Sequence, residues 1–267
     1  MNIVTAIQAR TSSRRLPGKV LLPLAGQPLL LRMIERVQRS SLAGTIIVAT
    51  SIMPEDDTIA ELCAINGIDC FRGSLTDLLD RHYMLALNYE ADALVKIPSD
   101  CPLIDPVVID HVIGYFLRHY PEFDFVSNLH PATYPDGNDV EIMSFVTLKT
   151  AWEKACRDFE REHTTPYIWE NSRKFRIGNV SWPAGLDFST SHRWTIDYEE
   201  DYRFIAEVYD WLYPVNPVFG LYDILYLIGK HPEIRKLNDR HAGRSWYENY
   251  LDDLNTIDDY KRKIKSL

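Results

Sequence analysis

The sequence predicts an α/β fold, a three-layer doubly wound sheet that is mostly parallel, with a small helical extension at the C-terminal end. Short apolar runs rich in β-branched residues alternate with amphipathic segments along the first half of the chain. With 267 residues, of which 46% are hydrophobic and 25% charged, the chain can bury the core of one large domain. A cluster of positive charge also follows the first apolar run, although the net charge is -9.

The first half of the chain has the repeating pattern of strand, helix and strand that is typical of a parallel sheet. The apolar run at 3–7 is the first expected strand. At 28–39, Leu29, Met33 and Val37 recur at the spacing of a helix. By the same criteria we expect strands at 45–50, 68–71 and 93–97, and helices at 55–66, 77–89 and 106–119.

The second half is less regular. We expect strands at 124–127, 140–145, 175–182 and 193–197, and helices at 147–158 and 165–171. Pro214 and Pro217 interrupt the chain before a helix at 221–229, and three helical segments close the sequence. We therefore expect a main domain over residues 1–213 and a helical extension packed on it over residues 214–267.

Several classes of protein are disfavoured by the sequence. No apolar run approaches the roughly 18 residues that span a bilayer, and the N-terminus reads directly into a strand without a signal-peptide pattern. We therefore expect a cytoplasmic protein that does not bind membranes. The negative net charge argues against binding to nucleic acid. The four cysteines lack the spacing of a zinc site or a disulfide framework.

The positive cluster lies in residues 8–21 and is the strongest indication of function. Small residues that expose backbone N–H groups, Ser12, Ser13 and Gly18, stand among the cations Arg10, Arg14, Arg15 and Lys19. Such a loop is suited to hold polyphosphate, and it follows the first strand, at the sheet edge where open α/β sheets bind ligands. The alternative is a solvated basic loop. The spacing matches neither of the common glycine-rich phosphate-binding motifs.

Two aspartates are candidate ligands of a divalent cation. Asp100 follows the strand predicted at 93–97, so it should lie at the same sheet edge as the basic loop. Asp197 stands where a predicted strand ends and a helix begins. Carboxylates are the ligands that Mg²⁺ prefers, although a lone aspartate before a proline is more commonly a cap or a turn residue. Asp105 is interpreted as the cap of the helix that begins at Pro106.

Acidic residues also crowd the first turn of the helix after Asp197, namely Glu199, Glu200 and Asp201. The helix dipole favours negative charge at that position, so we interpret these three as structural.

Five motifs in order resemble the sugar nucleotidyltransferases, and most closely the cytidylyltransferases that activate 3-deoxy sugar acids. Residues 9–19 match their N-terminal signature, with Gln8 in place of a proline. Residues 99–106 match the motif of the metal-binding aspartate, with Ser99 in place of a glycine, and residues 196–201 match a third motif from which Tyr198 and Glu199 depart. Residues 134–145 and 161–171 resemble the SpsF-like branch of spore-coat polysaccharide biosynthesis.

The resemblance implies the Rossmann-like nucleotide-diphospho-sugar transferase fold and a defined reaction. CTP and a sugar acid or related acceptor would give a CMP-linked sugar and pyrophosphate, for polysaccharide or glycoconjugate biosynthesis. Arg10, Arg15 and Lys19 would hold the β- and γ-phosphates, and Mg²⁺ would bind to Asp100 and Asp197. The other expected contacts to the nucleotide are Gln8, Ala9, Ser12, Ser13, Gly18, Lys96 and Ser99, and those to the acceptor are Asp139, Glu141, Arg161 and His163. We expect a homodimer.

Alternatives remain open at this stage. A glycosyltransferase of the GT-A type shares the fold and a metal carboxylate but uses a nucleotide sugar. A non-catalytic nucleotide-binding subunit is the other alternative. His163 by itself is more typical of a structural histidine, and Arg81 could form an ion pair or add positive charge to the site. No general base is identifiable, and no residue explains a choice of cytosine over uracil.

Overall fold

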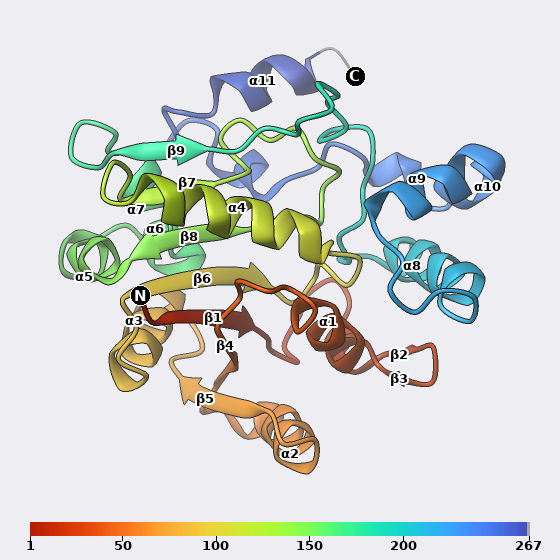
Figure 1. Ribbon diagram of the computed structural model, residues 1–267, viewed down its shortest axis with the longest axis horizontal. Coiled ribbons are helices and arrows are strands. Elements are labelled where there is room, and N and C mark those ends of the chain that lie inside the picture. The colour runs from red at the N-terminus through yellow and green to blue at the C-terminus, as the bar shows by residue number, and fades with distance from the viewer. Residues whose placement is uncertain (266–267) are drawn as a thin grey trace.

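A computed structural model describes residues 1–265, and its centre is a seven-stranded sheet with helices on both faces (Figure 1). The strands are β1 (Ile3–Gln8), β4 (Thr45–Ser51), β5 (Asp69–Gly73), β6 (Ala93–Pro98), β7 (Phe125–Ser127), β8 (Glu141–Ser144) and β9 (Ile177–Asn179). Their order is β5-β4-β1-β6-β8-β7-β9, and β8 runs antiparallel to both neighbours while the other pairs are parallel. This confirms the predicted doubly wound, mostly parallel sheet.

The sheet reverses its winding at β1, which lies between β4 and β6. At the end of β1, Gln8 is in register with Ala49 of β4 and with Pro98 of β6. Residues that directly follow the two strands, Ala9 after β1 and Ser99 after β6, line one pocket. Open α/β sheets bind their ligands at such a point.

Helices cover the two faces of the sheet and enclose two separate cores. One face carries α1 (Leu29–Val37), α2 (Asp57–Ile65) and α4 (Pro106–His119), and α1 and α4 lie in front of the sheet in Figure 1. The other face carries α3 (Leu78–Asn88), α5 (Phe145–Lys154), α6 (Asp158–His163) and α7 (Pro166–Trp169). Both cores consist of apolar side chains that alternate along the strands, as period-2 patterning requires.

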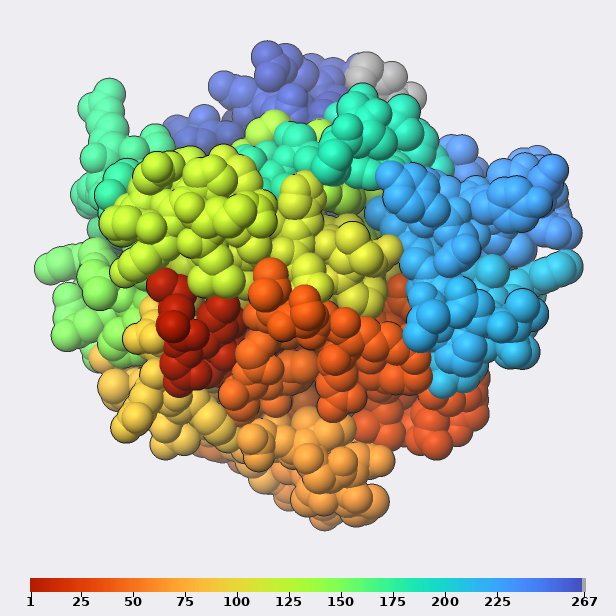
Figure 2. Space-filling model, in the orientation of Figure 1, coloured from red at the N-terminus to blue at the C-terminus, as the bar shows by residue number. Residues whose placement is uncertain are grey.

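The chain after Asp197 packs in two places. The helices α8 (Glu199–Leu212), α9 (Leu221–Lys230) and α10 (Pro232–Arg235) form a third core, which also contains Leu24 from the small hairpin of β2 (Pro23–Leu24) and β3 (Gln27–Pro28). The chain then returns, and Leu254 and Ile257 join the core beneath α5 and α7. It ends with α11 (Asp258–Ile264), which caps one end of the molecule (Figures 1 and 2).

Four short 3-10 helices complete the structure: η1 (Lys19–Leu21), η2 (Pro54–Asp56), η3 (Asp239–His241) and η4 (Trp246–Tyr250). Among the residues that the structure describes, no helix combines the length and apolar character needed to cross a membrane. All four cysteines are free thiols.

The main error in the predicted elements is the strand at 193–197. Arg193 forms only an isolated bridge with Asp136. The N–H of Trp194 then donates to the carbonyl of Asp136, and that of Ile196 to the carbonyl of Asp100. Because its backbone bonds to two different loops, the segment cannot form a regular ladder with one strand. Asp197 therefore precedes α8 from a loop and does not end a strand.

The bounds of other strands and helices differ from the prediction by a few residues. The strand predicted at 175–182 is reduced to β9, and the helix predicted at 147–158 ends at Lys154, before the separate helix α6. The prediction for Asp105 is confirmed, because its side chain caps α4 by accepting from the N–H of Val107.

Candidate active site

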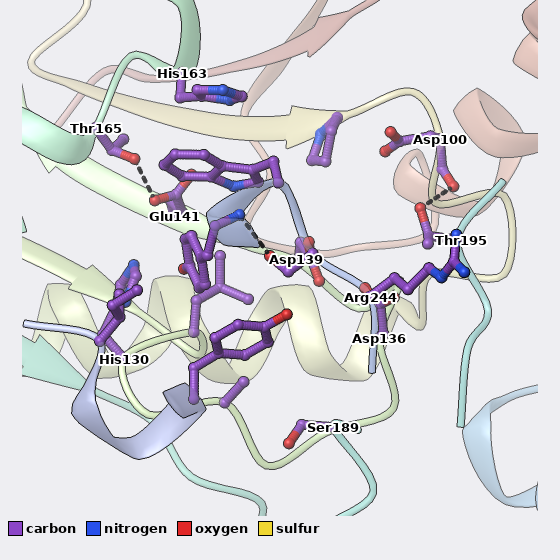
Figure 3. Close-up of a pocket in the computed structure, with 18 of the residues that line it drawn as sticks. Asp100, His130, Asp136, Asp139, Glu141, His163, Thr165, Ser189, Thr195 and Arg244 are labelled. Atoms are coloured by element: carbon purple, nitrogen blue, oxygen red, sulfur yellow. Dashed lines mark hydrogen bonds between the residues drawn. The ribbon is translucent and has the colours of Figure 1, made fainter. Parts of the chain in front are cut away.

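A pocket of about 1130 Å³ opens at the carboxyl ends of β1 and β6 and collects most of the predicted site residues (Figure 3). Those that line it are Gln8, Ala9, Arg10, Ser13, Arg15, Lys19, Lys96, Ser99, Asp100, Asp139, Glu141, His163 and Asp197. Ser12 and Arg161 line a smaller neighbouring depression, and Gly18 lines neither. The pocket thus joins the basic loop to residues from the second half of the chain.

Lys19 connects the two aspartates that the sequence singled out. Gly18 adopts a left-handed conformation with φ of 69°, which glycine tolerates without strain, and the chain then turns into η1 and buries Lys19. The Nζ of Lys19 lies 3.4 Å from Oδ2 of Asp100, 3.1 Å from Oδ1 of Asp197 and 2.5 Å from the carbonyl oxygen of Ile196. The two carboxylate oxygens can therefore be no further apart than the sum of their distances to Nζ.

The electrostatics of this group favour the charged forms. Burial works against the ammonium of Lys19, but the two carboxylates outweigh it and raise its pKa above the ordinary value. Burial likewise opposes ionisation of Asp197, yet Lys19, Arg15 and Arg193 hold its pKa below the usual range. Nη2 of Arg15 lies 2.7 Å from Asp197, and that of Arg193 lies 3.1 Å from it.

Arg193 is a site residue that sequence reasoning missed. Its guanidinium is buried and bonds to Asp136 at 3.3 Å and to Asp201 at 3.0 Å, in addition to Asp197. Asp201 also accepts from the N–H groups of Asp197 and Tyr198, so it caps α8 and orients Asp197. The one sequence signal for Arg193 was its position four residues before Asp197, just ahead of the third motif.

A group of carboxylates forms the second half of the pocket. Glu141 bonds to Nζ of Lys96 at 2.6 Å and accepts from the hydroxyl of Thr165 at 2.7 Å. Burial, reinforced by the charge of Asp100, raises the pKa of Asp139 to about 7. Burial and Asp139 together raise the pKa of Asp136 well above its usual range. Asp136 was not among the predicted residues, although it lies within the motif that contains Asp139.

His163, Arg161 and Arg81, which the sequence also singled out, each contact other parts of the protein. The ring of His163 stacks on Trp246, with centroids 3.7 Å apart, and burial lowers its pKa to about 3, so it is neutral at pH 7. Arg161 binds Asp77 through Nε at 2.9 Å and Nη2 at 2.5 Å. Arg81 donates to backbone carbonyls, including that of Ser74 at 2.8 Å, and forms no ion pair within the described chain.

The arginines of the basic loop that line the pocket remain available to bind a ligand. Arg10 and Arg14 line the pocket, and neither forms an ion pair or hydrogen bond with any residue in 1–265. Arg15 is half-exposed beside them. A guanidinium without a protein partner is suited to bind phosphate oxygens. This corner of the pocket therefore suits an anionic ligand.

The donor atoms around Lys19 are carboxylate and carbonyl oxygens, which suit a hard cation such as Mg²⁺. No cluster of three or more His, Cys, Asp or Glu residues positioned to hold a metal occurs in residues 1–265. A cation on Asp100 and Asp197 would therefore need further oxygen ligands from a phosphate or from water.

The doubly wound sheet, with a basic loop and paired aspartates at its switch point, defines a nucleotidyltransferase. A model of the cytidylyltransferase family matches residues 4–215, and the chain belongs to this family. Its activity is accordingly that of a nucleotidyltransferase.

Three proteins are similar to this chain over nearly its full length. An uncharacterized protein of Methanocaldococcus jannaschii is 36% identical over 93% of this chain and 99% of its own. The spore coat polysaccharide biosynthesis protein SpsF of Bacillus subtilis is 27% identical over 87% of this chain and 96% of its own. The solved structure of a cytidylyltransferase from Leptospira borgpetersenii is 34% identical, with a TM-score of 0.83 over 88% of this chain and 97% of its own.

One further relative matches less than half of the chain. The 3-deoxy-manno-octulosonate cytidylyltransferase of Trichlorobacter lovleyi is 39% identical over 120 residues, which are 44% of this chain and 46% of its own.

Proposed function

We propose that this protein transfers CMP from CTP to a hydroxyl of a sugar acid or a related acceptor and releases pyrophosphate, in polysaccharide or glycoconjugate biosynthesis. The observation that carries the proposal is the convergence of Lys19, Asp100 and Asp197 at the switch point, beside arginines without ion-pair partners. The SpsF similarity and the 3-deoxy-manno-octulosonate enzyme support the acceptor class.

The side chains divide the work of binding the triphosphate. Arg10 and Arg14 face the pocket without an ion pair to any residue in 1–265 and would bind the β- and γ-phosphates. Arg15, whose side chain is 51% exposed, can exchange Asp197 for a phosphate. Lys19 is buried and instead holds Asp100 and Asp197 at one point. Because phosphoryl-type transfer needs positioning and charge neutralisation more than covalent help, these are the functions the protein must supply.

Asp100 and Asp197 would hold Mg²⁺ together with oxygens of the triphosphate and water. When bound there, the ion would neutralise charge on the α-phosphate. Arg193 and Asp201 keep Asp197 oriented toward the same point.

Gln8 is suited to read the base. Its side-chain oxygen Oε1 is buried at the end of β1 and has no hydrogen-bond partner within residues 1–265. A buried acceptor without a partner costs about 1–3 kcal/mol, and the exocyclic amine of cytosine would satisfy it. Uracil presents a carbonyl at that position, so the same atom would disfavour UTP.

The experiment is a matrix of pyrophosphate release with CTP, UTP, ATP and GTP, with Mg²⁺ or EDTA, and with sugar acids and sugar phosphates as acceptors. We expect Mg²⁺-dependent release with CTP preferred. Gln8→Leu should reduce the preference for CTP over UTP. Cleavage of a nucleotide sugar without pyrophosphate would favour the GT-A alternative, and nucleotide binding without turnover would favour a non-catalytic subunit. Sedimentation of the same preparation checks the proposed homodimer.

A further inference from the structure

The segment at 243–260 lies beyond the region matched by the family model, which ends at residue 215. It nevertheless forms one side of the pocket. Its lining residues include Arg244, Trp246, Tyr247 and Tyr250. The segment returns from α10 across the molecule to α11, and Figure 3 shows Arg244 of this segment among the carboxylates of the pocket.

This segment is anchored to the main domain by several different contacts. The buried Arg193 donates through Nη1 to the carbonyl of Arg244 at 3.2 Å, and within the segment the hydroxyl of Tyr260 donates to the carbonyl of Gly243 at 3.0 Å. The carboxylate of Glu170 accepts from the N–H groups of Asn255 and Thr256, each at 2.9 Å. Leu254 and Ile257 are buried in a core of the main domain. The segment is therefore held firmly to the main domain where it lines the pocket.

Aromatic side chains give this segment a flat, partly apolar surface. Trp246 stacks on His163 and lies edge-on to Tyr247, with centroids 4.6 Å apart. Burial, with the charges of Glu141 and Asp139, raises the pKa of Tyr247 well above its usual range, so its hydroxyl stays a neutral donor. Flat aromatic surfaces of this kind suit the apolar faces of a ring whose edge is polar.

Arg244 places a cation near the paired aspartates. Its Nη1 lies 3.4 Å from the hydroxyl of Tyr198, the residue after Asp197. Its side chain is exposed and forms no ion pair with any residue in 1–265, and it extends toward Thr195 and Asp100 in Figure 3. By contrast, Lys19, Arg15 and Arg193 are already bound to the paired aspartates, and Lys96 is bound to Glu141.

We infer that residues 243–260 form the acceptor side of the active site, with Arg244 binding a carboxylate of the acceptor and Trp246 and Tyr247 covering its carbon skeleton. The inference rests on the proposed function and deepens it. An acceptor whose carboxylate lies next to the attacking hydroxyl must present both groups near Asp100 and Asp197. Arg244 supplies a cation near that place that forms no ion pair with any residue in 1–265. Hydroxyl or amino groups at the other end of the acceptor would donate to Asp139 and Asp136.

The test compares Arg244→Gln and Trp246→Leu with the wild-type chain, using 3-deoxy-manno-octulosonate as the acid probe and its analogue with a hydroxymethyl group in place of the carboxylate. A charged hydrogen bond contributes about 1.5–3 kcal/mol, so Arg244→Gln should raise the KM for the acid about 10- to 100-fold. Its effect on kcat should be smaller, and the Kd for CTP, measured by calorimetry without acceptor, should not change. The variant should also lose discrimination between acid and analogue.

Arg235→Gln is the matched control, because Arg235 is an arginine of the same C-terminal region that pairs with Asp239 outside the pocket. It should behave as wild type. If the wild-type enzyme uses the acid and Arg244→Gln keeps its KM, or if only neutral acceptors are turned over, the inference is wrong while the proposed function stands. Absence of pyrophosphate release with every acceptor would refute the proposed function itself, and the inference with it.

Discussion

Substitution of Lys19 by methionine should both destabilise the fold and abolish most turnover. The ammonium of Lys19, whose side chain is 11% exposed, bonds to Asp100, Asp197 and the carbonyl of Ile196. Methionine preserves much of the side-chain volume but removes the charge and all three hydrogen bonds. The two carboxylates then lie close together, with Arg15 and Arg193 still paired to Asp197 but no cation on Asp100.

The size of the effect follows from the burial of the group. Removing one partner of a buried ion pair costs about 3–5 kcal/mol. Because Asp100 keeps 31% of its side chain exposed, water relieves part of the repulsion, so we expect about 3 kcal/mol. A protein of this size loses roughly 2–4 °C of Tm for each kcal/mol. Turnover should fall by about 10²-fold or more, since the carboxylates lose their common anchor.

The pH dependence provides an independent check. In the wild type the lowered pKa of Asp197 stabilises the fold above about pH 4, and this contribution is lost as the pH falls through the lower folded value. The raised pKa of Lys19 stabilises below about pH 10 and is lost as the pH rises further. Without Lys19 the pKa of Asp197 rises, so the stability deficit of the variant should shrink as the pH falls from 7 to 5.

Urea denaturation at pH 7 and pH 5 measures both effects. Lys149→Met is the control, because Lys149 is 52% exposed and lies 4.0 Å from Glu153. Such a surface pair contributes less than about 1 kcal/mol. A loss below 1 kcal/mol for Lys19→Met, or a deficit that is the same at both pH values, would show that Lys19 does not hold the two carboxylates together in solution.

Three further predictions concern the same pocket. Asp100→Asn and Asp197→Asn should each remove most pyrophosphate release, and the double variant should lose little more, because both act at one point; additive losses would contradict a shared site. Arg15→Ala should raise the KM for CTP about 10-fold with a Tm within a few degrees of wild type, since its side chain is half-exposed, and an unchanged KM would remove it from the phosphate site. The pKa of Asp139 is raised to about 7, so its contribution to stability is lost as the pH rises from about 4, the ordinary value, to about 7, and it stays lost above that. Asp139→Asn should therefore raise the Tm at pH 8 more than at pH 5, and an equal shift at both would show that its carboxyl is not perturbed.

The sequence predicted the sheet of the first half well because the signals there are local. An apolar run followed by an amphipathic segment specifies a strand and a helix without reference to the rest of the chain, and the boundaries of β1, β4 and β6 differ from the prediction by a residue. The prediction of a strand at 193–197 was wrong because the interactions that decide its structure are not local. Its apolar residues Trp194 and Ile196 are buried against α8 and α9, whereas its backbone bonds to two loops that a local pattern cannot reveal.

The sequence by itself determined the chemistry of the pocket: a basic loop after the first strand and Asp100 after another, brought to one edge because parallel strands end together. Only the tertiary structure decided how these charges pair. It buried Lys19 between Asp100 and Asp197, joined Arg193 to Asp136, and turned Arg161 toward Asp77. It also carried residues 243–260 back to one side of the pocket. Ion pairs and burial depend on which distant segments meet, and that is a property of packing that sequence periodicity does not contain.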